Sequence, residues 1–62
     1  MKNRLGLVLL AMGVHQNELA RRINVKYTTI SMYVNGKRMP SVEMALKIAK
    51  ALGVKVEDIW EV

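Results

Sequence analysis

The stretch that decides the fold is GVHQNELARRINVKYTTISMYVNGKRMPS, residues 13–41. Apolar residues recur at helical spacing in two short runs, which predicts one helix over residues 16–23 and another over residues 27–34. Asn24 and Val25 are expected to form the turn between them, because asparagine adopts the left-handed backbone conformation more readily than most residues. The stretch therefore predicts two short helices joined by a tight turn.

The N-terminal flank predicts a first helix over residues 5–12, which Gly13 ends. Leu7 and Leu10 lie off the main apolar stripe of this helix, and they either pack beneath the last helix or belong to an interface. The stripe itself is expected to face the core and contains Leu5, Val8, Leu9 and Met12. At the start of the next helix, Glu18 resembles the acidic member of a capping box.

The C-terminal flank predicts two more helices. Ser41 is a good N-cap for a fourth helix over residues 42–52, which is apolar nearly all round and is therefore expected in the middle of the bundle. Gly53 ends it, and a last short helix follows over residues 56–60. The sequence thus predicts an all-α fold of five short helices, with residues 1–62 forming a single domain.

The composition excludes several classes of protein. The 62 residues can enclose only a small core, and the absence of cysteine excludes disulfides and zinc–thiolate sites. An apolar fraction of 52% is more than such a core needs, which indicates dimerisation. His15 is the only histidine and is expected at a helix start or facing a phosphate. We expect no cofactor, metal or small-molecule ligand.

Charge is distributed unevenly along the chain. Residues 1–56 carry ten Lys or Arg and only two acids, Glu18 and Glu43. Such an excess suits a polyanion, because each phosphate that is neutralised releases condensed counterions. The run over residues 5–14 looks like the apolar part of a signal peptide, but no small-residue cleavage site follows it. We therefore expect a buried first helix, no membrane span and a cytoplasmic protein.

The helix pair is the part of the chain that points to a function. Two short helices joined by a tight turn form the unit that places its second helix in the major groove of DNA. A solvated helix face normally mixes acidic and basic residues. The outward face of the second helix has no acid and is expected to present Lys26, Tyr27, Thr28, Ser31 and Met32.

These residues resemble the Cro/CI-type (xenobiotic-response-element) helix-turn-helix family, in its short stand-alone members. The likeness extends to KNRL at the start, MALKIAKALGV in the fourth helix and VEDIWEV at the end. Its most specific part is the spacing of Gln16, Leu19, Ala20, Val25, Ile30, Ser31, Asn35, Gly36 and Pro40. The resemblance implies a compact lambda-repressor-like fold, with the helix-turn-helix formed by the second and third helices.

The resemblance also implies roles for single residues. Bases would be read by Tyr27, Thr28 and Met32, with Lys26 reaching a guanine or a phosphate. Phosphates would be bound by Gln16, Thr29, Ser31, Asn35, Lys37 and Arg38. The usual base-reading Gln or Arg is absent. We therefore expect modest selectivity, biased toward thymine methyl groups and DNA shape.

Four further positions depart from the family pattern. Asn24 stands where the family usually has glycine, and Lys26 stands where it usually has a small polar cap. In several phage repressors a buried Arg–Glu pair joins the first and third helices, and the matching positions here are Leu9 and Val34. Replacing both partners of a buried ion pair by apolar residues is often neutral or stabilising. We therefore expect these two side chains to touch in the core.

The expected function is sequence-specific binding of double-stranded DNA by a transcriptional regulator, acting as a repressor and as a homodimer. Short family members pair through the C-terminal region, so the resemblance implies a dimer interface at Ile59, Trp60 and Val62. The other interpretation is that Trp60 only covers the core of its own chain. An alternative function is a protein-interaction module, either antitoxin-like or an adaptor. An enzyme is disfavoured, since no nucleophile–base set, carboxylate pair or phosphate loop is present.

Overall fold

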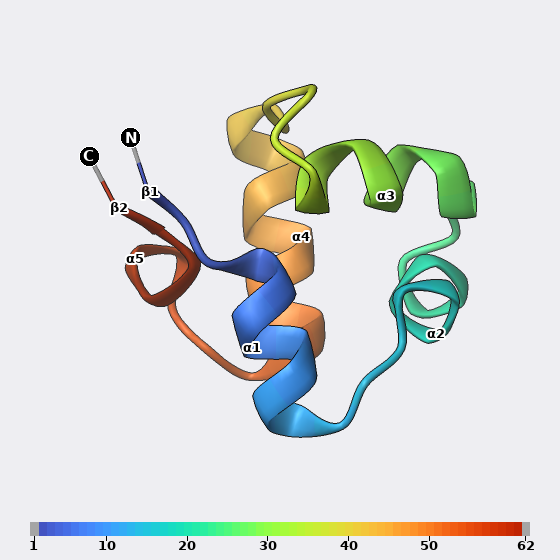
Figure 1. The fold of residues 1–62 in the computed structure, drawn as a ribbon, viewed down its shortest axis with the longest axis horizontal. Coiled ribbons are helices and arrows are strands. Elements are labelled where there is room, and N and C mark those ends of the chain that lie inside the picture. Colours follow the sequence, from blue (N-terminus) through green and yellow to red (C-terminus); the bar gives the residue numbers. More distant parts are fainter. Residues whose placement is uncertain (1, 62) are drawn as a thin grey trace.

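Five helices and one short strand pair make up the fold in the computed structural model, which describes residues 2–61 (Figure 1). In chain order the elements are β1 (Lys2–Asn3), α1 (Leu5–Met12), α2 (Gln16–Arg22), α3 (Tyr27–Val34), α4 (Val42–Leu52), α5 (Val56–Ile59) and β2 (Trp60–Glu61). The predicted helical class is confirmed, and α3 begins and ends where the sequence indicated. Helix α4 is the longest, with 11 residues, and no described helix is long and apolar enough to cross a membrane.

The core draws one fully buried side chain from each helix. These side chains are Leu5, Leu19, Ile30, Ile48 and Ile59. Removing a side chain of this size from water contributes about 1.5–3 kcal/mol. Because α2 packs against both α3 and α4, and α1 packs against α3, this core fixes the position of the helix pair.

The strand pair was not predicted. Lys2 lies opposite Glu61 and Asn3 opposite Trp60 in an antiparallel register. Trp60 has an extended backbone, so α5 ends one residue earlier than predicted. The two described ends of the chain therefore lie side by side (Figure 1). An ion pair between Arg4 and Glu61 joins them further.

Local signals decide several helix ends. The hydroxyl of Ser41 accepts a hydrogen bond from the Met44 N–H at 3.1 Å, so the predicted cap of α4 is confirmed. Asn24 has a φ of 60°, which confirms the left-handed turn before α3. The prediction of a capping box at the start of α2 is wrong. The His15 side chain makes no cap, and the Glu18 carboxylate instead accepts a hydrogen bond from Arg22, one helical turn along.

Several apolar side chains lie outside the core. Met12 is exposed, although the stripe of the first helix placed it inside. Leu7 and Leu10 are also exposed, so they do not pack beneath α5. Helix α4 is buried on one face only, and Val42 and Leu46 project from the other. The buried face consists of Ala45, Ile48, Ala49 and Leu52.

Helices α1 and α3 approach closely. A Cβ atom added to Gly6 would lie 3.3 Å from a methyl carbon of Val34, which is tighter than an ordinary contact. Leu9 is buried in the core, and Val34 is partly buried against it. The direct contact between Leu9 and Val34 stays a prediction.

Candidate nucleic-acid interface

The helix pair is built from α2 and α3, which pack closely. Ala20 is buried on α2, and its carbonyl accepts a hydrogen bond from the Val25 N–H at 2.9 Å. Ile30 from α3 is fully buried, and Val25 is partly buried against the core. This packing holds α3 with one face inward and leaves its other face open.

The exposed start of α3 carries three of the four predicted base-reading residues. Lys26, Tyr27 and Thr28 are all exposed, with Tyr27 at 53%. Lys26 makes no side-chain cap, so the first N–H groups of α3 stay open to a partner. The positive end of a helix favours anions such as phosphate.

Met32, the fourth predicted base reader, is less available. Its side chain is partly buried, one turn beyond Thr28. Its carbonyl accepts hydrogen bonds from the N–H groups of Lys37 and Arg38, at 3.0 and 3.4 Å, which folds the following loop back onto α3. Gly36 allows this fold with a φ of 73°. Thr28 therefore offers more surface for reading bases than Met32 does.

The predicted phosphate-binding residues of α3 and the loop after it divide into two groups. Asn35, Lys37 and Arg38 are exposed in the loop after α3, and within residues 2–61 neither basic side chain pairs with a carboxylate. Thr29 and Ser31 are partly buried, and the Ser31 hydroxyl accepts a hydrogen bond from the Asn35 amide at 3.4 Å. The loop thus presents its positive charges uncompensated.

A hollow joins the starts of α2 and α3. It has a volume of about 550 Å³ and is lined by His15, Gln16, Asn17 and Tyr27. The side-chain oxygen of Gln16 is buried there without a hydrogen-bond partner in the described chain. The sequence identified Gln16 and Tyr27 but missed Asn17, whose only signal was its position beside Gln16.

The predicted dimer interface needs correction. Ile59 is fully buried in its own chain, so it has no surface to offer a second copy. Trp60 keeps only 7% of its surface exposed, and Val62 lies outside the described residues. The interpretation that Trp60 covers its own core is the one that fits these exposures.

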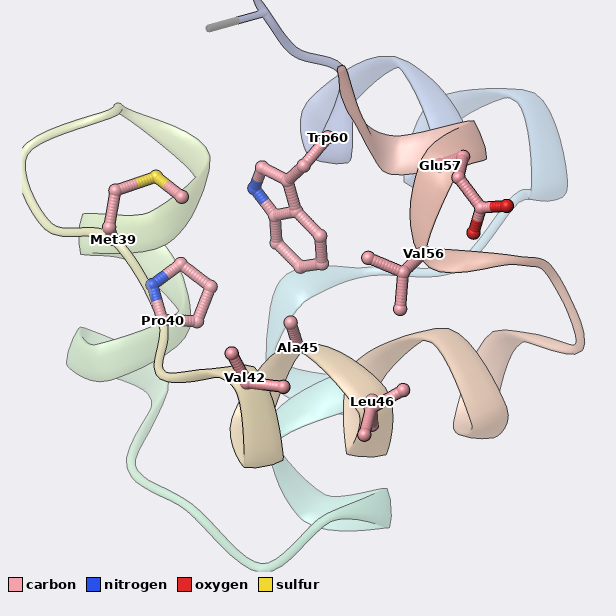
Figure 2. A pocket seen from close by; sticks show the side chains of 8 residues that line it. All are labelled: Met39, Pro40, Val42, Ala45, Leu46, Val56, Glu57 and Trp60. Atoms are coloured by element: carbon pink, nitrogen blue, oxygen red, sulfur yellow. The ribbon is translucent and has the colours of Figure 1, made fainter. Parts of the chain in front are cut away.

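An apolar groove lies beside Trp60 instead (Figure 2). Its volume is about 360 Å³, and its lining consists of Met39, Pro40, Val42, Ala45, Leu46, Val56, Glu57 and Trp60. Met39, Val42 and Leu46 are 52%, 79% and 57% exposed. The indole N–H of Trp60 is buried without an acceptor in residues 2–61. The sequence did not predict this groove. Apolar residues lie on most sides of α4, so the pattern does not show which of them remain exposed.

Two packed helices with a left-handed turn, an acid-free exposed start of the second helix and a basic loop after it define a helix-turn-helix protein. Residues 6–59 match the helix-turn-helix family, and the chain belongs to this family, in agreement with the Cro/CI-type resemblance.

Three relatives illustrate the range of this family. An uncharacterized HTH-type transcriptional regulator from Methanocaldococcus jannaschii is 42% identical over 97% of this chain and 91% of its own length. Another from Bacillus subtilis is 33% identical with the same coverage of both chains. Multiprotein-bridging factor 1 from Eremothecium gossypii is 43% identical over 71% of this chain, which corresponds to 29% of the factor.

Proposed function

We propose that this chain is a cytoplasmic transcriptional regulator that binds double-stranded DNA through α3 and acts as a repressor. The observation that carries the proposal is the exposed, acid-free start of α3 beside a loop whose basic side chains are unpaired within residues 2–61. Relatives that match almost the whole chain are HTH-type transcriptional regulators, which supports the same class of function.

Phosphate contacts supply most of the affinity in this proposal. The contacting residues are Gln16, Thr29, Ser31, Asn35, Lys37 and Arg38, and each neutralised phosphate releases counterions. Tyr27 and Thr28 read bases, with help from Lys26 and a small contribution from Met32. The threonine methyl group packs on a thymine methyl, and its hydroxyl offers one hydrogen bond. Since no bidentate base contact is available from these side chains, selectivity is modest.

The regulator acts as a homodimer whose interface is the apolar groove between the loop after α3 and α5. Monomers rarely leave a large contiguous apolar patch in water, and a second copy would cover it. Met39 and Pro40 lie in the loop between α3 and α4 and form one wall of the groove. In this proposal the two α3 helices of the symmetric dimer enter half-sites about 34 Å apart on one side of the duplex.

A protein-interaction module is the second candidate function. It is favoured by the exposure of Leu7 and Leu10 on α1, which the proposed DNA face and groove leave uncovered. The relative named multiprotein-bridging factor 1 is consistent with such a module. This function predicts weak DNA binding that depends little on salt.

Selection from random duplexes tests the DNA-binding proposal. The wild-type chain is expected to enrich a site and to bind it at least about tenfold more tightly than a scrambled duplex, which is modest beside the roughly 10³-fold or greater preference of stringent DNA-binding proteins. Thr28→Ala should reduce this preference and leave binding of the scrambled duplex unchanged. Thr29→Ala is the matched control, because a lost phosphate contact weakens both duplexes equally. Absence of an enriched site, or equal weakening of both duplexes by Thr28→Ala, would contradict base reading by α3.

A further inference from the structure

A basic hollow lies between the C-terminal end of α2 and the outer side of α4. Its volume is about 360 Å³, and it is lined by Arg22, Ile23, Asn24, Lys47, Lys50 and Ala51. None of the side chains proposed to contact DNA or the second copy lines it. The hollow is therefore a separate surface that the proposed function does not use.

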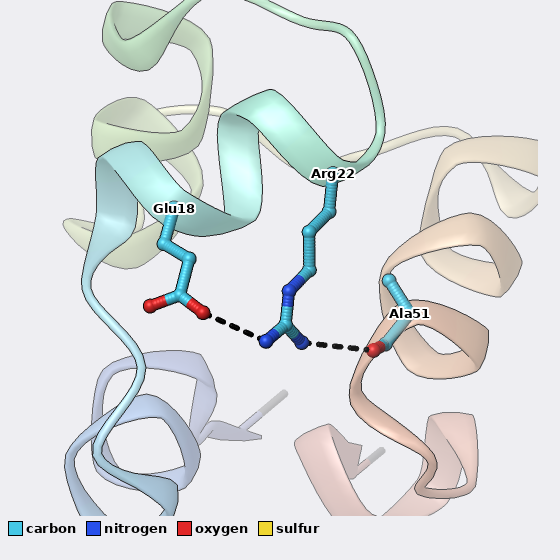
Figure 3. Close-up of polar contacts among 3 residues, drawn as sticks. All are labelled: Glu18, Arg22 and Ala51. Atoms are coloured by element: carbon cyan, nitrogen blue, oxygen red, sulfur yellow. Dashed lines mark hydrogen bonds and ion pairs between the residues drawn. The ribbon is translucent and has the colours of Figure 1, made fainter.

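Arg22, which lines this hollow, bridges α2 and α4 (Figure 3). Its guanidinium donates one hydrogen bond to Glu18 at 2.7 Å and another to the carbonyl of Ala51 on α4 at 3.3 Å. The side chain thus spans from α2 to α4 and holds the two sides of the hollow together. A partner would meet a preformed site, which lowers the entropy lost on binding.

Two lysines supply uncompensated charge at the rim. Lys47 and Lys50 are exposed and lie three residues apart, so they share one side of α4. Neither forms an ion pair within residues 2–61, and the carboxylate of Glu18 is already paired with Arg22. Ile23 and Ala51 are partly buried and form an apolar floor below them. Lysines that are only solvated on a helix surface do not need an apolar floor beside them, and this floor distinguishes Lys47 and Lys50 from such lysines.

Asn24 adds a polar group to the same rim. With a φ of 60° it occupies a backbone conformation in which glycine is unstrained. An asparagine at this position brings a side-chain amide, which can both donate and accept hydrogen bonds, to the edge of the hollow. Such an amide suits the recognition of a peptide backbone.

We propose that this hollow binds a short acidic segment of a partner protein that carries one apolar side chain. Carboxylates of the segment pair with Lys47 and Lys50, its apolar side chain packs on Ile23 and Ala51, and the Asn24 amide binds its main chain. A DNA backbone has the charge but no projecting aliphatic side chain for the floor, so a protein segment fits the hollow better than a second duplex.

Titration of the full chain with a labelled peptide tests the site. The probe is a short peptide of Asp and Glu residues around a central Leu, followed by fluorescence anisotropy and amide NMR shifts. The double variant Lys47→Gln, Lys50→Gln should bind it about tenfold more weakly, as expected for two exposed ion pairs near the upper end of their range. Lys55→Gln is the matched control, since Lys55 is exposed elsewhere, and should bind as the wild type does. Replacing the central Leu of the peptide by Ser should also weaken binding.

Three results would overturn the proposal. The first is equal peptide affinity of the double variant and Lys55→Gln. The second is a set of peptide-induced shifts centred on α3 rather than on Asn24, Lys47 and Ala51. The third is a loss of duplex affinity in the double variant as large as its loss of peptide affinity, which would assign the surface to DNA. All substituted lysines are exposed, so an unchanged thermal unfolding curve should accompany each variant.

Discussion

The side-chain amide of Asn3 donates a hydrogen bond to the backbone carbonyl of Tyr33 at 2.7 Å, joining β1 to the last turn of α3. The amide oxygen of the same side chain accepts from the N–H of Leu5 at 3.1 Å, at the start of α1. Asn3 thus connects the N-terminal strand to two helices at once. Helix α3 is therefore held at its C-terminal end by a residue close to the N-terminus of the chain.

Asn3→Ala is expected to lower the free energy of unfolding by about 1–2 kcal/mol, because two hydrogen bonds are lost and the Tyr33 carbonyl keeps only the one from the Gly36 N–H. Urea denaturation followed by circular dichroism measures this change. Lys2→Ala is the control, since its side chain is exposed, and should change stability by less than about 0.5 kcal/mol. Similar small effects of both variants would show that the Asn3 hydrogen bonds contribute little.

Asn24 should prove replaceable by glycine but not by alanine. A residue with a Cβ and no side-chain hydrogen bonds loses about 1 kcal/mol in the left-handed region, whereas glycine adopts it freely. Asn24→Ala should therefore lower the unfolding free energy by about 1 kcal/mol. Asn24→Gly should leave it unchanged or raise it slightly. Thermal unfolding of both variants checks this, and equal stability of the two would contradict the assigned turn geometry.

Leu9 and Val34 should behave as neighbours. Leu9→Arg places an unpaired charge in the core and is expected to lower the unfolding free energy by about 3–5 kcal/mol. Adding Val34→Glu should restore part of the lost unfolding free energy, because the introduced positive charge then gains a negative partner. The two positions match those of the buried Arg–Glu pair that the family resemblance indicates. The control combines Leu9→Arg with Leu10→Glu, because Leu10 is exposed. Rescue by the control but not by Val34→Glu would refute the pairing.

The groove should mediate dimerisation. Sedimentation equilibrium is expected to show a dimer for the wild type and a monomer for Val42→Glu combined with Leu46→Glu. Both side chains are exposed in the monomer, so the variant should keep its helical circular dichroism spectrum. Leu7→Glu combined with Leu10→Glu is the matched control, with the same charge added to exposed leucines of α1, and should remain dimeric. If the groove variant stayed dimeric and the control became monomeric, the interface would instead lie on α1.

The sequence predicted the features that depend on local chemistry. The limits of α3, the left-handed Asn24 and the cap at Ser41 are each decided by a few neighbouring residues, and the structure has all three. The strand pair depends instead on Lys2 meeting Glu61, at opposite ends of the chain. No local pattern reports such a pairing.

The same distinction between local and long-range contacts explains why the sequence could not locate the dimer interface. Trp60 is covered by its own chain because β2 folds back onto β1, and its residue type alone could not show this. Helix α4 is apolar on most sides, so its sequence could not indicate that Val42 and Leu46 face outward. The proposed DNA face of α3 could be predicted because the outward residues of this helix contrast with its buried ones, Ile30 and Tyr33.

The most direct test of the central claim is the affinity for duplex DNA across a salt series, for the wild type and for Lys37→Glu combined with Arg38→Glu. We predict that the wild-type binding constant falls steeply with salt, with a slope near −0.9 per phosphate contact. The double variant should bind far more weakly and with a shallower slope. Unchanged binding by the double variant, or wild-type binding that does not respond to salt, would contradict the proposed docking of α3 and its following loop on DNA.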